Sequence, residues 1–210
     1  MFKADPGWIE QQGFKTDAIL NHQDIIPFVK SFLFRKNKIT VFYLVFNILI
    51  CIWLIYSMFI SVYTNILTLG EAFTWFSWGC LIPFLLVPIH EGLHGIAYKG
   101  CGAKTVSYDV NWKQFYFMAI ADKFVATRKS FMIVALTPFT IITLALLIPV
   151  LFPSTPSVDI MLITATFVHG SMCAGDFGLL SYFETNRNKE VITYDDRGEG
   201  LSYFFVRDKA

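Results

Sequence analysis

Four long apolar stretches constrain this chain more than any other feature of its sequence. They run from Ile39 to about Tyr63, from about Ala72 to Tyr98, from Ser130 to Phe152 and from about Val158 to Phe183. A helix needs roughly 20 apolar residues to cross about 30 Å of hydrocarbon, and each stretch reaches that length. The sequence therefore predicts an α-helical integral membrane protein with four transmembrane helices.

Composition supports this prediction and excludes other classes. The 210 residues are 55% hydrophobic and only 16% charged, whereas a soluble domain carries about 25% charged residues. The 22 phenylalanines exclude intrinsic disorder, and a net charge of +1 gives no reason to expect a nucleic-acid partner. The four cysteines show neither a C-x-x-C pair nor the spacing of a disulfide scaffold.

The basic residues indicate how the chain is oriented. All 17 Lys and Arg residues lie in the amino-terminal segment, in the loop between the second and third stretches, or in the tail. The loops 64–71 and 153–157 contain none. Because cytoplasmic loops are enriched in Lys and Arg, we expect a multi-pass protein of the plasma membrane with both termini and the central loop in the cytoplasm.

Three segments outside the apolar stretches have their own patterns. Residues 23–34 place apolar side chains at helical spacing, which predicts an amphipathic helix lying on the cytoplasmic membrane surface, with a plain linker as the alternative. Residues 104–127 alternate as in an interfacial β-hairpin. Strand-like runs on both sides of 195–200 predict a second hairpin in the tail.

These patterns divide the chain into three parts. We expect a cytoplasmic amino-terminal segment at 1–38, a four-helix membrane domain resembling a peptidase at 39–183, and a cytoplasmic tail at 184–210. The β-structure is expected to be small and to lie on the cytoplasmic side of the membrane.

One pentapeptide in the second stretch points to metal chemistry. The string His90-Glu91-Gly92-Leu93-His94 places two imidazoles one helical turn apart, so both can bind one metal ion. The intervening Glu91 is then placed to take a proton from a water molecule at the metal. The alternative is that the second membrane span ends at Ile89 and that these polar residues simply face water.

A catalytic zinc site needs a third protein ligand, and the fourth stretch offers two candidates. On a straight helix, Asp176 lies about 27 Å from the start of its stretch, and His90 lies about 27 Å from the start of the second. On the same count, His169 lies only about 16 Å from the start of the fourth stretch. Asp176 is therefore the expected ligand, with a helix cap or a partner for a cytoplasmic arginine as alternatives. His169 is expected to contact a ligand rather than the metal.

The motifs resemble those of a known family. The string His90–Gly95, Thr137-Pro138 in the next stretch and Ala174-Gly175-Asp176 in the last are similar to the small bacterial putative zincin peptidases, a group related to the site-2 protease clan. The tail segment 194–205 is also similar, so the resemblance covers roughly residues 75–206.

The resemblance implies a core of membrane helices that holds Zn²⁺ through His90, His94 and Asp176, with Glu91 as general base. It also implies that a hairpin at 104–127 presents a transmembrane or membrane-associated peptide substrate. Site-2 proteases carry an Asn-x-x-Pro and a Leu-Asp-Gly motif, whereas this chain has Ala-Gly-Asp-Phe-Gly at 174–178 and no clear counterpart of that Asn.

Three functions follow from the residues. The first is a zinc metallopeptidase that cleaves membrane substrates near the cytoplasmic face. The second is a metal-binding regulator or scaffold without hydrolytic activity, which the absence of the Asn favours. The third is a proton- or ion-handling membrane protein that uses Glu91, His169 and Asp176. The absence of an internal repeat argues against the third.

Overall fold

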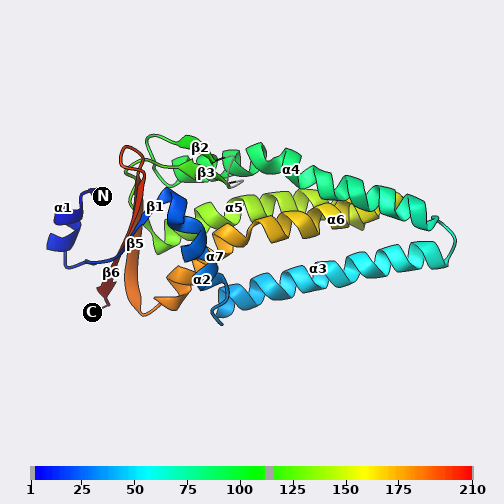
Figure 1. The fold of residues 1–210 in the computed structure, drawn as a ribbon, viewed down its shortest axis with the longest axis horizontal. Helices are drawn as coiled ribbons and strands as arrows, with labels where there is room; N and C mark the ends of the chain where they lie inside the picture. The colour runs from blue at the N-terminus through cyan, green and yellow to red at the C-terminus, as the bar shows by residue number, and fades with distance from the viewer. Residues whose placement is uncertain (1–2, 112–115, 210) are drawn as a thin grey trace. The chain divides into compact units, whose positions relative to one another are not determined.

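The computed structural model describes residues 3–111 and 116–209, and its secondary structure is mostly helical (Figure 1). Three helices are long and apolar enough to cross a membrane, namely α3 (Lys38–Tyr63), α4 (Leu69–Gly100) and the segment Arg128–Leu151. That third segment consists of α5 (Arg128–Leu147) followed by the short 3-10 helix η2 (Pro149–Leu151). These elements confirm three of the four predicted apolar helices.

The fourth predicted span is divided into two helices, which together have the length and hydropathy of a membrane span. The structure has α6 (Pro156–Met172) and α7 (Ala174–Thr185), with a bend of 47° between them. Cys173 occupies the break, and Gly170 and Gly175 flank it. Glycine is a poor helix former, so the helix is easily interrupted here. Hydropathy alone does not register such a break.

Helix α4 begins three residues before the predicted position because of a capping box. The backbone N–H of Thr68 donates to Glu71 Oε2 at 2.8 Å, and the Glu71 N–H donates to Thr68 Oγ1 at 3.2 Å. Two backbone donors that a helix start leaves unpaired are satisfied in this way. The helix then continues without interruption past Pro83, Pro88 and Ile89.

The chain divides into two compact units, of which the first comprises residues 1–40, 91–137 and 175–210. It contains a four-stranded antiparallel sheet in the order β1-β6-β5-β4. The strands are β1 (Lys15–Asn21), β4 (Ala126–Thr127), β5 (Lys189–Asp196) and β6 (Leu201–Asp208). Strands β5 and β6 confirm the hairpin predicted in the tail.

The amino-terminal segment completes this sheet and covers one of its faces. It contains α1 (Pro6–Gln11), β1, the 3-10 helix η1 (His22–Asp24) and α2 (Ile25–Leu33). Helix α2 lies within the segment that was predicted to be an amphipathic helix on the membrane surface, but its aromatic side chains contact the protein instead. Its Phe28 and Phe32 rings contact Tyr182 of α7, and Phe28 also contacts Phe204 of β6. The apolar face of α2 therefore packs into the protein core.

A separate two-stranded sheet lies in the same unit. Strand β2 (Ser107–Asn111) pairs antiparallel with β3 (Tyr116–Ile120), with Tyr108 opposite Ala119. These strands confirm the hairpin predicted within 104–127, whose connecting residues 112–115 lie outside the described ranges. The last residues of the predicted segment belong instead to β4, which pairs with β5.

The second unit comprises residues 41–90 and 138–174, and it is entirely helical. Its core joins Ile50 and Leu54 of α3 to Ala72 of α4 and to Ile160 and Ile163 of α6. By contrast, large apolar side chains elsewhere on α3 and α4 are exposed, as expected for surfaces that face lipid; examples are Leu49, Ile52, Ile55, Phe84 and Leu85.

Candidate metal centre

The predicted metal-binding motif lies in the carboxyl-terminal part of α4. Because the helix is unbroken from Leu69 to Gly100, His90 and His94 lie one turn apart on the same face. Ligand atoms of His90, Glu91 and His94 within this turn lie within 4.8 Å of one another. The helix therefore continues past Ile89, and His94 is buried rather than exposed.

His94 is held in one orientation by the backbone of α5. Its Nδ1 lies 3.0 Å from the carbonyl oxygen of Val134. A carbonyl oxygen can only accept a hydrogen bond, so Nδ1 carries a hydrogen in this contact. The other ring nitrogen, Nε2, lies 3.3 Å from Oδ1 of Asp176, in the first turn of α7. His94 therefore presents Nε2 toward the predicted third ligand.

The distance between His94 and Asp176 fits a shared zinc ion. Zinc bonds to imidazole nitrogen and carboxylate oxygen are about 2.0–2.2 Å long, so tetrahedral coordination places the two ligand atoms about 3.4 Å apart. The observed 3.3 Å separation matches this value. Both side chains are largely shielded from solvent, with relative exposures of 10% and 17%. Metal coordination would compensate the burial of this carboxylate.

Glu91 contacts the β2–β3 hairpin. Its Oε2 accepts a hydrogen bond from the backbone N–H of Ala119 in β3 at 2.9 Å. On the opposite strand, the Tyr108 hydroxyl lies where a side chain at Gly95 would otherwise project. Glycine at this position therefore allows the hairpin to approach the helix closely. One cross-strand pair, Tyr108 and Ala119, thus meets the motif helix at two points.

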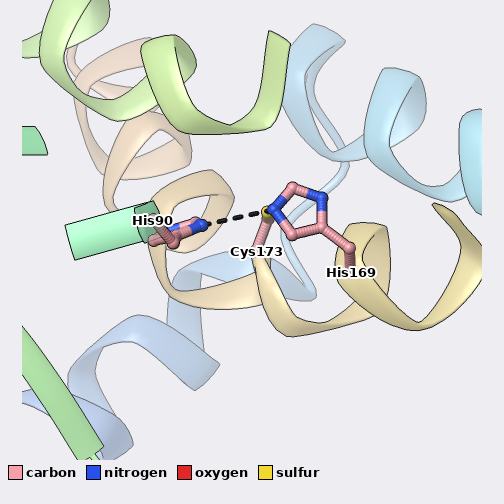
Figure 2. Close-up of side chains that lie close together, drawn as sticks. All are labelled: His90, His169 and Cys173. Carbon is pink, nitrogen blue, oxygen red and sulfur yellow. Dashed lines mark hydrogen bonds between the residues drawn. The ribbon is translucent and has the colours of Figure 1, made fainter. Parts of the chain in front are cut away.

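His90 contacts a different set of side chains. Its Nδ1 lies 3.3 Å from Nε2 of His169 on α6, and the two rings meet edge to face with centroids 5.5 Å apart. The Cys173 sulfur lies 3.8 Å from the same His169 nitrogen, and Figure 2 shows the three side chains together. His169 and Cys173 are buried, with exposures of 2% and 1%.

The contacts of His169 agree only in part with the sequence prediction. His169 was expected to contact a ligand, and the structure shows that contact with His90. The count of residues along the two helices, however, predicted that His169 and His90 would be about 10 Å apart along the helix axis. That value requires both helices to start at the same level, although α4 has 32 residues and α6 has 17.

Cys173 was not predicted as a possible ligand. It belongs to no C-x-x-C pair and to no disulfide-type spacing. The available signal was the spacing of His169 and Cys173, which are four residues apart and so lie on the same side of a helix.

Comparison with known proteins adds one finding. A family model described as a putative zincin peptidase matches residues 83–189, a segment that includes the motif of α4, the hairpin, and both His169 and Asp176. No curated protein and no solved structure matches the chain.

Proposed function

The chain belongs to the putative zincin peptidase family, and on that basis we propose that it is a zinc-dependent metallopeptidase embedded in the membrane. The observation that carries this proposal is the contact between His94 Nε2 and Asp176 Oδ1. It joins a carboxylate of the last helix pair to the two-histidine motif, which is the type of ligand set that a zinc peptidase requires.

In this proposal His90, His94 and Asp176 bind the ion and leave one position open for water or substrate. Zinc, when bound, polarises a peptide carbonyl and lowers the pKa of a coordinated water molecule to about 7. The Nδ1–H of His94 is fixed by the Val134 carbonyl, which orients Nε2 for coordination. His169 lies beside Nδ1 of His90, just as the Val134 carbonyl lies beside Nδ1 of His94.

Glu91 is the proposed general base. Its carboxylate accepts a proton from the attacking water as the water oxygen bonds to the peptide carbonyl carbon. It then passes that proton to the amide nitrogen as the C–N bond breaks. The hydrogen bond from Ala119 limits the orientations of this carboxylate and links it to the hairpin.

The hairpin is the proposed docking site for substrate, by analogy with site-2 proteases. The N–H of Ala119 points to Glu91 rather than across the ladder to Tyr108. The outer edge of β3 therefore faces the general base. An extended peptide that pairs with this edge would lie beside the proposed site.

The apolar helices support a membrane setting. Helices α3 and α4 and the segment ending at Leu151 have the length and hydropathy of membrane-spanning helices. The Lys and Arg distribution favours a site toward the cytoplasmic face of the plasma membrane. The substrate would then be a transmembrane or membrane-associated protein, which meets a site at this depth directly.

The variant Glu91→Gln tests the proposal. The amide keeps an oxygen that accepts from Ala119 but cannot take up a proton, so peptide hydrolysis is expected to fall by at least about 100-fold. Zinc content should be unchanged. The matched control is Glu71→Gln at the other end of α4, which should retain full activity. Hydrolysis that persists in Glu91→Gln would refute the proposed role of this residue.

A second function, a metal-binding regulator without hydrolytic activity, is favoured by one observation. Residues 174–178 read Ala-Gly-Asp-Phe-Gly, and the chain has no clear counterpart of the Asn found in site-2 proteases. In that case zinc binds as proposed, no peptide is cleaved, and Glu91→Gln leaves the protein's function intact.

A further inference from the structure

Three side chains of the second unit form a cluster whose chemistry differs from that of the proposed peptidase site. His90, His169 and Cys173 each offer a ligand atom, and these atoms lie within 4.8 Å of one another. We propose that the cluster is a second metal site, formed by two imidazoles and a thiolate. It goes beyond the proposed function, although it shares His90 with the peptidase site.

The distances fit a tetrahedral ion of the size of zinc. With zinc–nitrogen bonds of about 2.05 Å and a zinc–sulfur bond of about 2.3 Å, two nitrogens lie about 3.35 Å apart and nitrogen and sulfur about 3.6 Å apart. The observed distances are 3.3 Å between His90 Nδ1 and His169 Nε2, and 3.8 Å between His169 Nε2 and Cys173 Sγ. The ligand atoms of the remaining pair, His90 and Cys173, lie within 4.8 Å of each other.

Local structure holds two of the three ligands in place before any ion arrives. His169 lies in the last turn of α6, and the Cys173 N–H donates to the His169 carbonyl at 3.1 Å. This backbone contact keeps the cysteine one turn beyond the histidine, on the same side of the helix. At Gly170 an added Cβ would contact the Phe46 ring at 3.0 Å, so α6 approaches α3 closely beside the cluster.

The donor set selects the class of ion. Thiolate and imidazole favour borderline and soft ions such as Zn²⁺ and Cu⁺, whereas Mg²⁺ and Ca²⁺ require oxygen ligands. His169 and Cys173 are almost fully buried, and a buried thiol becomes a ligand only when it loses its proton. Binding therefore releases the Cys173 proton to solvent as the metal–sulfur bond forms.

The shared histidine makes the two sites alternatives. A neutral imidazole has one nitrogen lone pair available and carries a hydrogen on its other nitrogen. Coordination through Nδ1 of His90, beside His169, leaves a hydrogen on Nε2 and removes this residue from the peptidase site. An ion held by Cys173 thus withdraws one of the three ligands of the proposed catalytic zinc. Occupation of the second site is expected to inhibit the peptidase.

Cobalt substitution tests this proposal. Co²⁺ replaces Zn²⁺ and gives an intense ligand-to-metal charge-transfer absorption in the near ultraviolet only when a thiolate is bound. The full-length protein, purified in detergent and titrated with Co²⁺, is expected to develop this band. Cys173→Ser and His169→Gln should remove or strongly weaken it. Cys101→Ser, directly after the end of α4, is the matched control and should retain it.

Asp176→Asn separates this proposal from the proposed function. The substitution removes a ligand of the peptidase site only, so the charge-transfer band should persist or increase at the same Co²⁺ concentration. Melting temperatures of all variants show whether each protein is folded. The absence of the band in folded wild-type protein at saturating Co²⁺, or its persistence in Cys173→Ser, would overturn the second site without affecting the peptidase proposal.

Discussion

The Nε2 atom of His94 lies 3.3 Å from Oδ1 of Asp176, although the two residues belong to helices far apart in the sequence. The Val134 carbonyl orients the histidine ring, and the first turn of α7 positions the carboxylate. A zinc ion bound to both atoms would require a separation of about 3.4 Å. The structure of the first unit therefore brings these two proposed ligands to a suitable distance.

Asp176→Asn is expected to weaken zinc binding strongly. Loss of a residue that only orients a ligand typically lowers metal affinity 10- to 100-fold, so loss of the carboxylate ligand should lower it by more than about 100-fold. The control is Asp159→Asn, which alters the other aspartate of α6 and α7, near the start of α6. Competition against a chelator of known affinity measures the zinc affinity of both variants. Equal affinities in the two variants would argue against Asp176 as a ligand.

Hydropathy was sufficient to predict α3, α4 and α5, because crossing a bilayer requires long uncharged runs. Two details needed other information. The start of α4 depends on the capping box between Thr68 and Glu71, and the interruption after α6 depends on local geometry at Cys173. The pairing of β1 with β6 could not be predicted, since it joins opposite ends of the chain and local patterns carry no register.

The candidate site was predictable where its residues share one helix. The spacing of His90 and His94 follows from helix geometry alone. Asp176, on another helix, was selected because its distance along the fourth stretch matches that of His90 along the second. The relation between His90, His169 and Cys173 was only partly found. It depends on how far α6 is displaced along α4, and a count of residues along separate helices does not supply that displacement.

Close helix packing makes Gly79 sensitive to substitution. A Cβ at this position would lie 2.5 Å from the Met161 carbonyl oxygen and from Thr164 Cβ on α6, so α4 and α6 would have to separate. We expect Gly79→Ala to destabilise the protein by about 1–3 kcal/mol.

Gly92 on the same helix provides the control for this substitution. A Cβ added there would meet no atom within 4 Å among the described residues outside its own helix, so Gly92→Ala should be neutral or stabilising. Thermal unfolding in detergent compares the two variants. Similar losses of stability would show that close packing is not what requires glycine at position 79.

The buried carboxyl of Asp195 in β5 is expected to make the stability of the protein depend on pH. Burial is the main cause that raises the pKa of its carboxyl, with a contribution from Asp122, while the Ser202 hydroxyl and His22 act in the opposite direction. The neutral acid is therefore favoured in the folded state. Its stabilising contribution is complete below the pKa of the unfolded chain, about 4, and is lost as the pH rises through the higher folded value.

Asp195→Asn removes this titration and keeps an oxygen that can accept the hydrogen bond from Ser202. We expect the melting temperature of the wild type to decrease, relative to this variant, as the pH rises above about 4. Asp208→Asn, at the exposed end of β6, should follow the wild type. Parallel curves for wild type and Asp195→Asn would show that this carboxyl does not control the pH response.

The most direct test of the zinc peptidase assignment is hydrolysis of a model transmembrane peptide by the purified protein in lipid vesicles. It should be measured before zinc removal, after removal with a chelator, and after zinc is restored. We expect cleavage to stop when zinc is removed and to return when about one zinc per chain is restored. Cleavage that continues in the metal-free protein, or its absence in folded protein that contains zinc, would contradict the assignment.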